Sequence, residues 1–108
     1  MEQSDDLAGA EKEYAGALRL VPGNAKWHGE FGFFLIRLIK LAEAETELRE
    51  AIRLDPDLAE AHANLGVLLG SVHQTTEARQ ELTTALKLFA AVGNSDKITM
   101  YSNLLAKI

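Results

Sequence analysis

The sequence predicts an all-α protein built from repeated helical hairpins. Three observations carry this prediction. The 108-residue chain matches itself when it is shifted by 34 positions, its apolar residues recur at three- and four-residue spacing, and no window alternates with a period of two. A self-match at a period of roughly 20–50 residues is typical of repeat arrays. We therefore expect about six helices that form a fragment of an α-solenoid and end in a C-terminal capping helix.

The repeat is clearest between residues 25–58 and residues 59–92. A shift of 34 aligns segment 25–32 with segment 59–66, and it also aligns Glu43-Ala44, Glu47-Leu48 and Ala51 with Glu77-Ala78, Glu81-Leu82 and Ala85. The same shift in the other direction places Ala10, Glu13, Ala17 and Pro22 on Ala44, Glu47, Ala51 and Pro56. The same shift of 34 residues therefore aligns three segments of the chain. This agreement predicts a half repeat at 3–22, followed by two complete units.

Each complete unit has the pattern of two helices. In the first unit, Asn24 is expected to cap a helix, and Pro56 follows the second helix because proline has no amide donor. In the next unit, Asp57 and Glu60 have the spacing of a capping box, and Thr75 or Thr76 is expected to cap the helix that runs to about Ala91. The half repeat supplies one helix that ends near Leu20.

Two glycines interrupt otherwise good helices at the same repeat position. Gly32 and Gly66 lie mid-helix, where glycine costs about 1 kcal/mol relative to alanine. Their repetition predicts that another helix approaches too closely for a side chain.

The last segment, 94–108, departs from the 34-residue pattern. Gly93 can end the preceding helix in a left-handed conformation, and Asn94, Ser95 or Asp96 can cap the next one. Its apolar residues fall on one side, as expected for a capping helix: Ile98, Tyr101, Leu104, Leu105 and Ile108. We therefore predict a single domain over 1–108, with a half repeat at 3–22, repeats at 25–58 and 59–92, and a capping helix at 94–108.

Composition and charge exclude several classes of function. The chain carries 11 Lys and Arg against 16 Asp and Glu, and its net charge of −5 argues against binding nucleic acid, whose phosphates must be neutralised by cations. It has no cysteine, which excludes disulfides and thiol chemistry. The longest apolar stretch, 31–41, contains Arg37 and Lys40 and is shorter than the roughly 20 residues that span a bilayer. The first six residues are acidic, unlike a secretory signal, so we expect a soluble, cytoplasmic chain without membrane insertion.

The histidines are the first candidates for catalysis or metal binding. His28 and His62 occupy the same place in successive units, and a role as fillers of the helix–helix contact is favoured over a ligand role. His73 falls in a predicted turn. Carboxylates at i,i+4 spacing, such as Glu43 and Glu47, fit solvent-facing charges better than an acid–base pair. No nucleotide loop or nucleophile motif is present, so we expect no enzyme activity, no cofactor and no metal.

Position by position, the units resemble the tetratricopeptide repeat (TPR). The residues that carry the resemblance are Phe31-Gly32, Leu35, Ala44, Leu48, Ala51 and Pro56 in one unit and Leu65-Gly66, Leu69, Ala78, Leu82 and Ala85 in the next. Two features depart from the family pattern. Trp27 lies one position before the usual aromatic, where this chain has His28 and His62, and the turns at Ile39-Lys40 and His73-Gln74 lack the customary glycine.

The resemblance implies a protein-interaction module or scaffold that is not catalytic. In TPR arrays the first helix of each unit lines a concave groove that receives a peptide or helix of a partner protein. The family's groove positions correspond here to Lys26, Glu30, Phe33, Ile36, Arg37, Glu60, Asn64, Val67 and Ser71. A carboxylate clamp for chaperone C-termini is not expected, because only Asn64 matches it, while Gly29, Phe33, Glu60 and Ala63 occupy its other positions.

Two alternatives remain open at this point. Repeat units bury their apolar faces against neighbours, so a first helix without its own partner predicts either modest stability or self-association as a homodimer through that helix. The chain also has the pattern expected of a TPR fragment within a larger multidomain protein.

Overall fold

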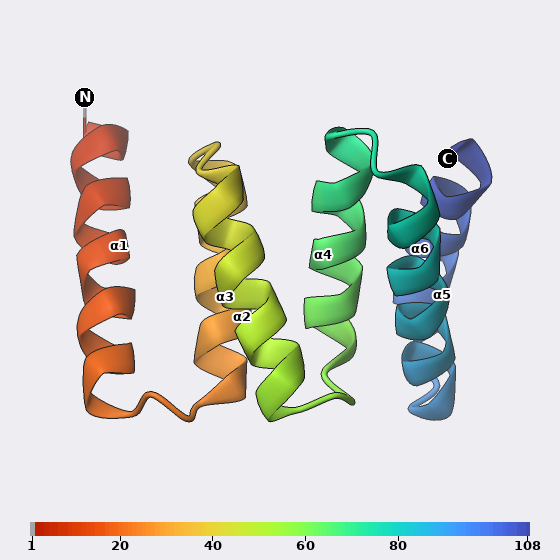
Figure 1. The fold of residues 1–108 in the computed structure, drawn as a ribbon, viewed down its shortest axis with the longest axis horizontal. Coiled ribbons are helices and arrows are strands. Elements are labelled where there is room, and N and C mark those ends of the chain that lie inside the picture. The colour runs from red at the N-terminus through yellow and green to blue at the C-terminus, as the bar shows by residue number, and fades with distance from the viewer. Residues whose placement is uncertain (1) are drawn as a thin grey trace. The chain divides into compact units, whose positions relative to one another are not determined.

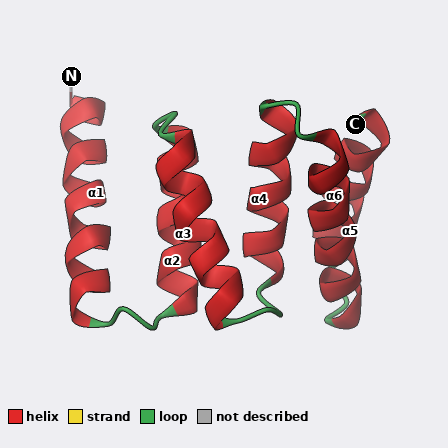
Figure 2. Cartoon of the chain, in the orientation of Figure 1, coloured by secondary structure: helices red, strands yellow, loops and turns green. Residues whose placement is uncertain are grey.

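The computed structural model describes residues 2–108, with side chains from Leu7 onward; Met1, with which the predicted domain begins, lies outside the described residues. The described residues form six helices and no strand (Figures 1 and 2): α1 (Glu2–Leu20), α2 (Ala25–Arg37), α3 (Leu41–Leu54), α4 (Ala59–Ser71), α5 (Thr75–Ala91) and α6 (Ser95–Lys107). The predicted all-α class and the number of helices are confirmed.

The chain divides into two compact units, the first ending at Pro56 and the second beginning at Asp57. In unit 1, α2 and α3 pack as a helical hairpin, and α1 packs against α2. In unit 2, α4 and α5 form the equivalent hairpin, and α6 packs against α5. Each unit therefore contains one two-helix hairpin and one additional helix.

In each hairpin, a glycine of the first helix lies directly against the second helix. A Cβ added to Gly32 would lie 2.6 Å from Cγ of Leu48 and 3.3 Å from the carbonyl oxygen of Ala44. In unit 2 a Cβ on Gly66 would lie 2.7 Å from Cγ of Leu82. The close approach predicted from the two mid-helix glycines is confirmed, because no side chain fits between the paired helices.

A polar contact joins the same two helices in each hairpin. In unit 1, Nδ1 of His28 lies 2.7 Å from Oε1 of Glu47, and Nε2 of His28 lies 2.7 Å from the carbonyl oxygen of Pro22. In unit 2, Nδ1 of His62 donates to Oε1 of Glu81 at 2.8 Å. Both histidine side chains are largely covered. Each histidine links the two helices of its hairpin, as predicted for a side chain that fills the contact between them.

Two of the predicted helix caps are confirmed. Oδ1 of Asn24 accepts the backbone N–H of Trp27 at 2.9 Å, and Oδ1 of Asn94 accepts that of Lys97 at 3.1 Å. Gly93 adopts the expected left-handed conformation, with φ of 71°.

The caps predicted for α4 and α5 are wrong. The cap positions are Leu58 and Gln74, neither of which makes a side-chain cap hydrogen bond. Thr75 and Thr76 already lie inside α5, and Asp57 lies one residue before the cap of α4. Leu58 follows the capping residue Asn24 by 34 positions, so the hairpin register, not the local capping chemistry, determines where α4 begins.

The short turns inside the hairpins take a left-handed conformation without glycine. Ile39 has φ of 60° and His73 has φ of 66°, and these residues are one repeat apart. A left-handed conformation places Cβ too close to the following carbonyl oxygen in any L residue, and it is least tolerated by β-branched side chains. The absence of the customary glycine therefore leaves backbone strain at Ile39.

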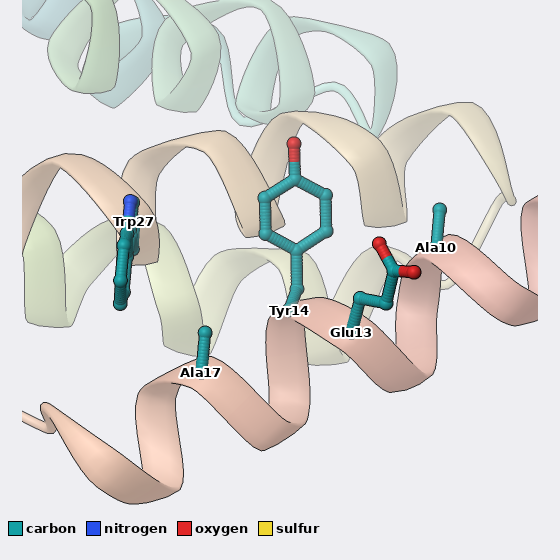
Figure 3. A pocket seen from close by; sticks show the side chains of 5 residues that line it. All are labelled: Ala10, Glu13, Tyr14, Ala17 and Trp27. Atoms are coloured by element: carbon teal, nitrogen blue, oxygen red, sulfur yellow. The ribbon is translucent and has the colours of Figure 1, made fainter.

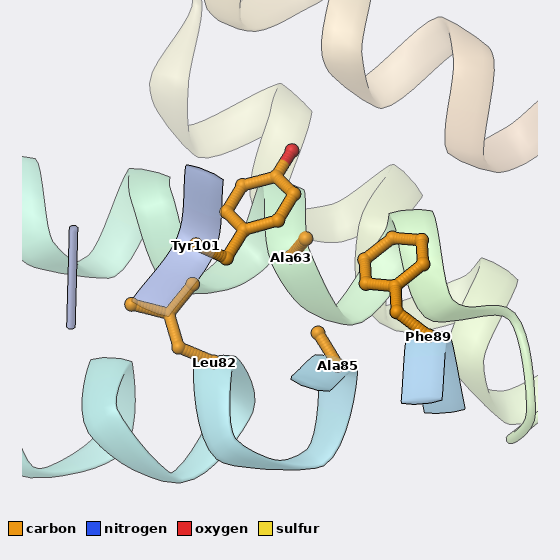
Figure 4. Packing of buried hydrophobic residues seen from close by; sticks show 5 residues of the cluster. All are labelled: Ala63, Leu82, Ala85, Phe89 and Tyr101. Carbon is orange, nitrogen blue, oxygen red and sulfur yellow. The ribbon is translucent and has the colours of Figure 1, made fainter. Parts of the chain in front are cut away.

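The core of unit 2 forms where α6 meets the hairpin (Figure 4). The rings of Phe89 and Tyr101 stack with centroids 5.8 Å apart, beside the buried side chains of Ala63, Leu82 and Ala85. The other apolar residues predicted to share one side of the last helix also pack against this cluster: Ile98, Leu104, Leu105 and Ile108. The amphipathic pattern of the C-terminal segment is thus confirmed.

Aromatic packing and one ion pair attach α1 within unit 1. The ring of Tyr14 lies 5.7 Å from that of Phe31 and 5.7 Å from that of Phe34. Nζ of Lys40 donates to both carboxylate oxygens of Glu11, at 3.0 and 2.9 Å. No helix within residues 2–108 has the length and apolarity needed to cross a membrane.

Candidate partner-binding surface

One face of α2 presents an exposed aromatic ring among charged side chains. Lys26, Glu30, Phe33 and Arg37 follow one another at spacings of four, three and four residues, which places them on one side of the helix. All four are exposed, and Phe33 retains 48% of its accessible surface. Ile36 lies half-buried beside them. We call Lys26, Glu30, Phe33, Ile36 and Arg37 the α2 stripe.

The sequence of α2 explains why Phe33 is left outside the core. The apolar side chains that α2 buries are Phe31, Phe34 and Leu35. Phe33 lies on another side of the helix, where the folded unit does not cover it. A large exposed aromatic surrounded by charges is the composition found at protein-binding sites.

Two charges of the α2 stripe, those of Lys26 and Glu30, are only weakly paired with each other. Nζ of Lys26 lies 4.0 Å from Oε2 of Glu30, and both side chains are substantially exposed. Pairs of this kind contribute little to stability, so the cation and the carboxylate can exchange partners at low cost.

The corresponding residues of α4 interact with other residues of unit 2. Nζ of Lys97 on α6 lies 3.5 Å from Oε2 of Glu60, and Val67 packs against the α6 core cluster. Oγ of Ser71 donates to the carbonyl oxygen of Leu68 at 2.6 Å, and Asn64 is half-buried. The predicted groove residues of each helix thus lie on one face of that helix. Among these residues, the only large apolar side chain that is exposed is on α2.

Unit 1 also contains a hollow that sequence reasoning missed. An open cavity of about 360 Å³ is lined by residues of α1 together with Trp27 of α2 (Figure 3): Ala10, Glu13, Tyr14, Ala17 and Trp27. We call it the α1–α2 hollow. The sequence signal that could have indicated this hollow is the match of Ala10, Glu13 and Ala17, after a shift of 34 residues, to positions of the second helix of a hairpin.

The resolved pKa shifts lie away from the α2 stripe. Burial raises the pKa of the Tyr101 phenol, and the nearby Glu60 charge adds to this effect. The hydrogen bond from Lys40 to Glu11 raises the pKa of the Lys40 ammonium, and Arg53 lowers the pKa of the Glu50 carboxyl. Among the side chains that the structure describes, no group of three or more His, Asp or Glu is placed to hold a metal ion.

Comparison with known proteins places this arrangement among helical repeats. Residues 40–71, which span α3 and α4, match the model of the TPR repeat family. No curated protein matches the sequence. The TPR2B domain of yeast Sti1, in its complex with pHsp70, aligns with 97% of this chain and 84% of its own, at 23% identity and a TM-score of 0.88.

Two further solved structures share the fold. The type III secretion translocator chaperone SycD of Yersinia enterocolitica aligns with 98% of this chain and 74% of its own, at 17% identity and a TM-score of 0.89. The first TPR of Spaghetti (RPAP3), bound to the HSP90 peptide SRMEEVD, aligns with 96% of this chain and 83% of its own, at 20% identity and a TM-score of 0.76. At these identities the likeness shows the fold.

The chain is an all-α protein of helical-hairpin repeats. Its resemblance to the tetratricopeptide repeat is confirmed by the family match over residues 40–71 and by the TPR-like fold.

Proposed function

We propose that this protein is a non-catalytic interaction module whose α2 stripe binds a peptide or helix of a partner protein. The observation that carries the proposal is Phe33, which is half-exposed between Lys26, Glu30 and Arg37 on one helix face. The solved structures of the Sti1 domain with pHsp70 and of Spaghetti with an HSP90 peptide support it, since both contain partners bound to the same fold.

The positions of the histidines support a role without catalysis. His28 and His62 each donate to a glutamate of the neighbouring helix, and that contact recurs in both hairpins. A contact repeated at one repeat position is explained by the packing of the hairpin, so neither ring is needed for chemistry.

The proposal is tested by affinity capture from native cell extract with the wild-type chain, Phe33→Glu and Leu20→Glu. Leu20 is a matched control because it is an exposed apolar residue of unit 1 outside the α2 stripe. A protein retained by the wild type and by Leu20→Glu but lost with Phe33→Glu supports the proposal. Equal retention by all three, with helicity unchanged by circular dichroism, refutes it.

The peptide SRMEEVD serves as a specificity control. Binding of this peptide is not expected, because Gly29 and Phe33 occupy positions where a carboxylate clamp requires polar side chains. Self-association through α1, the alternative function, predicts a concentration-dependent dimer by analytical ultracentrifugation that Phe33→Glu leaves intact.

A further inference from the structure

The ring of His28 lies between two oxygen atoms that come from different parts of unit 1. Its Nδ1 is 2.7 Å from Oε1 of Glu47 on α3, and its Nε2 is 2.7 Å from the carbonyl oxygen of Pro22, in the loop between α1 and α2. Both separations are hydrogen-bond distances. Only 12% of the His28 side chain is exposed, so the ring is largely enclosed in this position.

Both oxygen atoms can only accept a hydrogen bond. A backbone carbonyl has no proton to donate, and neither has an ionised carboxylate. A neutral imidazole carries one N–H group, whereas the imidazolium carries two. In a neutral ring, one nitrogen would direct its lone pair at an oxygen atom 2.7 Å away. Only the imidazolium form of His28 donates to Glu47 and to Pro22 at the same time.

The charged groups on α3 that face the ring are carboxylates. Glu47 is in direct contact with His28. The pKa of the Glu50 carboxyl is lowered chiefly by its hydrogen bond to Arg53, and the charge of His28 adds to this lowering. Within the described residues of α1, no charged side chain makes a hydrogen bond or ion pair with the ring. On α2 itself, the charged neighbours lie 4.0 Å from each other: Lys26 and Glu30.

We propose that His28 is a proton-dependent link, in which the imidazolium ties the loop between α1 and α2 to α3 and loss of the proton releases the loop. A hydrogen bond to a carboxylate is stronger than one to a carbonyl, so the neutral ring keeps its contact with Glu47 and gives up that with Pro22. The backbone hydrogen bonds of the loop, from Val21 to Ala17 and from Asn24 to Val21, run within the segment 17–24. His28 therefore provides the link from this segment to α3.

Release of the loop changes the surroundings of Trp27. Trp27 precedes His28 on α2 and lines the α1–α2 hollow together with Ala17, near the end of α1 (Figure 3). The loop joins the end of α1 to the start of α2, so its release loosens this end of the hollow. The ring of Tyr14 still holds the middle of α1 against Phe31. Opening is therefore expected near Trp27 and not along the whole helix.

The sign of the pH dependence follows from the proton that the folded chain holds. An imidazole in an unfolded chain loses its proton near pH 6.5, to about one unit. Because both contacts of His28 require the imidazolium, folding favours the proton-bound ring. The stabilisation is complete below that pH and declines as pH rises through the range in which the folded ring loses its proton.

The emission of Trp27, the only tryptophan of the chain, provides the readout. From about pH 5.5, above the range in which carboxylates take up protons, to about pH 8.5, we expect the emission maximum of the full chain to move to longer wavelength. The reason is that water reaches the indole when the loop is released. Circular dichroism over the same range should show that the helices persist.

Three variants separate a proton-dependent link from simple packing. His28→Gln keeps a side-chain N–H but cannot titrate, so its emission should not depend on pH. Glu47→Gln removes the charge that favours the proton, and the midpoint of the emission change should move to lower pH. His62→Gln removes the corresponding histidine of unit 2, which lies 2.8 Å from Glu81, and should respond as the wild type does.

NMR of the ring nitrogens tests the protonation directly in the wild-type chain. His28 should keep both N–H protons at higher pH than His73, which is exposed in the turn between α4 and α5. The proposal is overturned if His28 loses its proton at the same pH as His73 or below it. It is also overturned if the emission of the helical wild type is independent of pH, or if the change persists in His28→Gln.

Discussion

Gly32 and Leu48 approach each other so closely that the α2–α3 hairpin has no room for a methyl group between them. A Cβ on Gly32 would lie 2.6 Å from Cγ of Leu48 and 2.8 Å from its Cδ2. Leu48 is buried, and the carbonyl oxygen of Ala44 lies 3.3 Å from the same point, so neither neighbour can withdraw easily. The hairpin geometry therefore depends on glycine at this position.

Gly32→Ala is expected to destabilise the protein by about 1–2 kcal/mol, because overpacking outweighs the gain of about 1 kcal/mol in helix propensity. Gly16→Ala is the matched control. Nothing lies within 4 Å of a Cβ at Gly16 in α1, so that variant should gain about 0.5–1 kcal/mol. Urea denaturation measures both changes, and equal stabilisation by the two variants would contradict the close approach.

The contact between His28 and Glu47 is expected to stabilise unit 1 measurably. A double-mutant cycle with His28→Ala and Glu47→Ala should give a coupling free energy of about 1 kcal/mol, as is typical of a largely covered hydrogen bond to a carboxylate. The exposed pair Lys26 and Glu30, 4.0 Å apart, should give less than about 0.5 kcal/mol in the same experiment. Similar couplings in the two cycles would argue against a structural role for His28.

Ile39→Gly is expected to raise the free energy of unfolding by up to about 1 kcal/mol. Glycine relieves a left-handed conformation that costs an L residue about 1–2 kcal/mol, and this relief exceeds the entropy that glycine adds to the unfolded chain. Little packing is lost, since Ile39 is 76% exposed. Val21→Gly, at an exposed position without positive φ, should instead lower stability. If thermal denaturation shows both variants destabilised, Ile39 is not strained.

Tyr101 is expected to make unit 2 sensitive to alkaline pH. Because burial raises the pKa of the phenol above its ordinary value of 10.0, the unfolded chain loses this proton at a lower pH than the folded chain. Its contribution is complete below pH 10 and declines as pH rises through the folded-state pKa. Denaturation at pH 8 to 11 should show a steeper loss in wild type than in Tyr101→Phe, and parallel curves would exclude the effect.

The sequence alone determined the repeat, the number of helices and the principal packing contacts. A period of 34 residues can be recognised without coordinates because each hairpin must bury the same face, and Gly32 and Gly66 showed where the helices meet. The caps at Asn24 and Asn94 were also predictable, since they depend on local backbone amides.

The tertiary structure decided what each predicted surface residue does. Val67 and Phe33 occupy the same repeat position, yet Val67 packs against the α6 cluster while Phe33 stays half-exposed, because only the fold brings α6 to Val67. The capping box predicted at Asp57 is wrong because the cap of α4 is Leu58, one residue later and one repeat after Asn24. The α1–α2 hollow likewise depends on how α1 and α2 pack, which places Tyr14 and Trp27 around one cavity. A periodic pattern specifies which face of a helix is apolar, but only the packing of neighbouring helices determines which part of that face remains open.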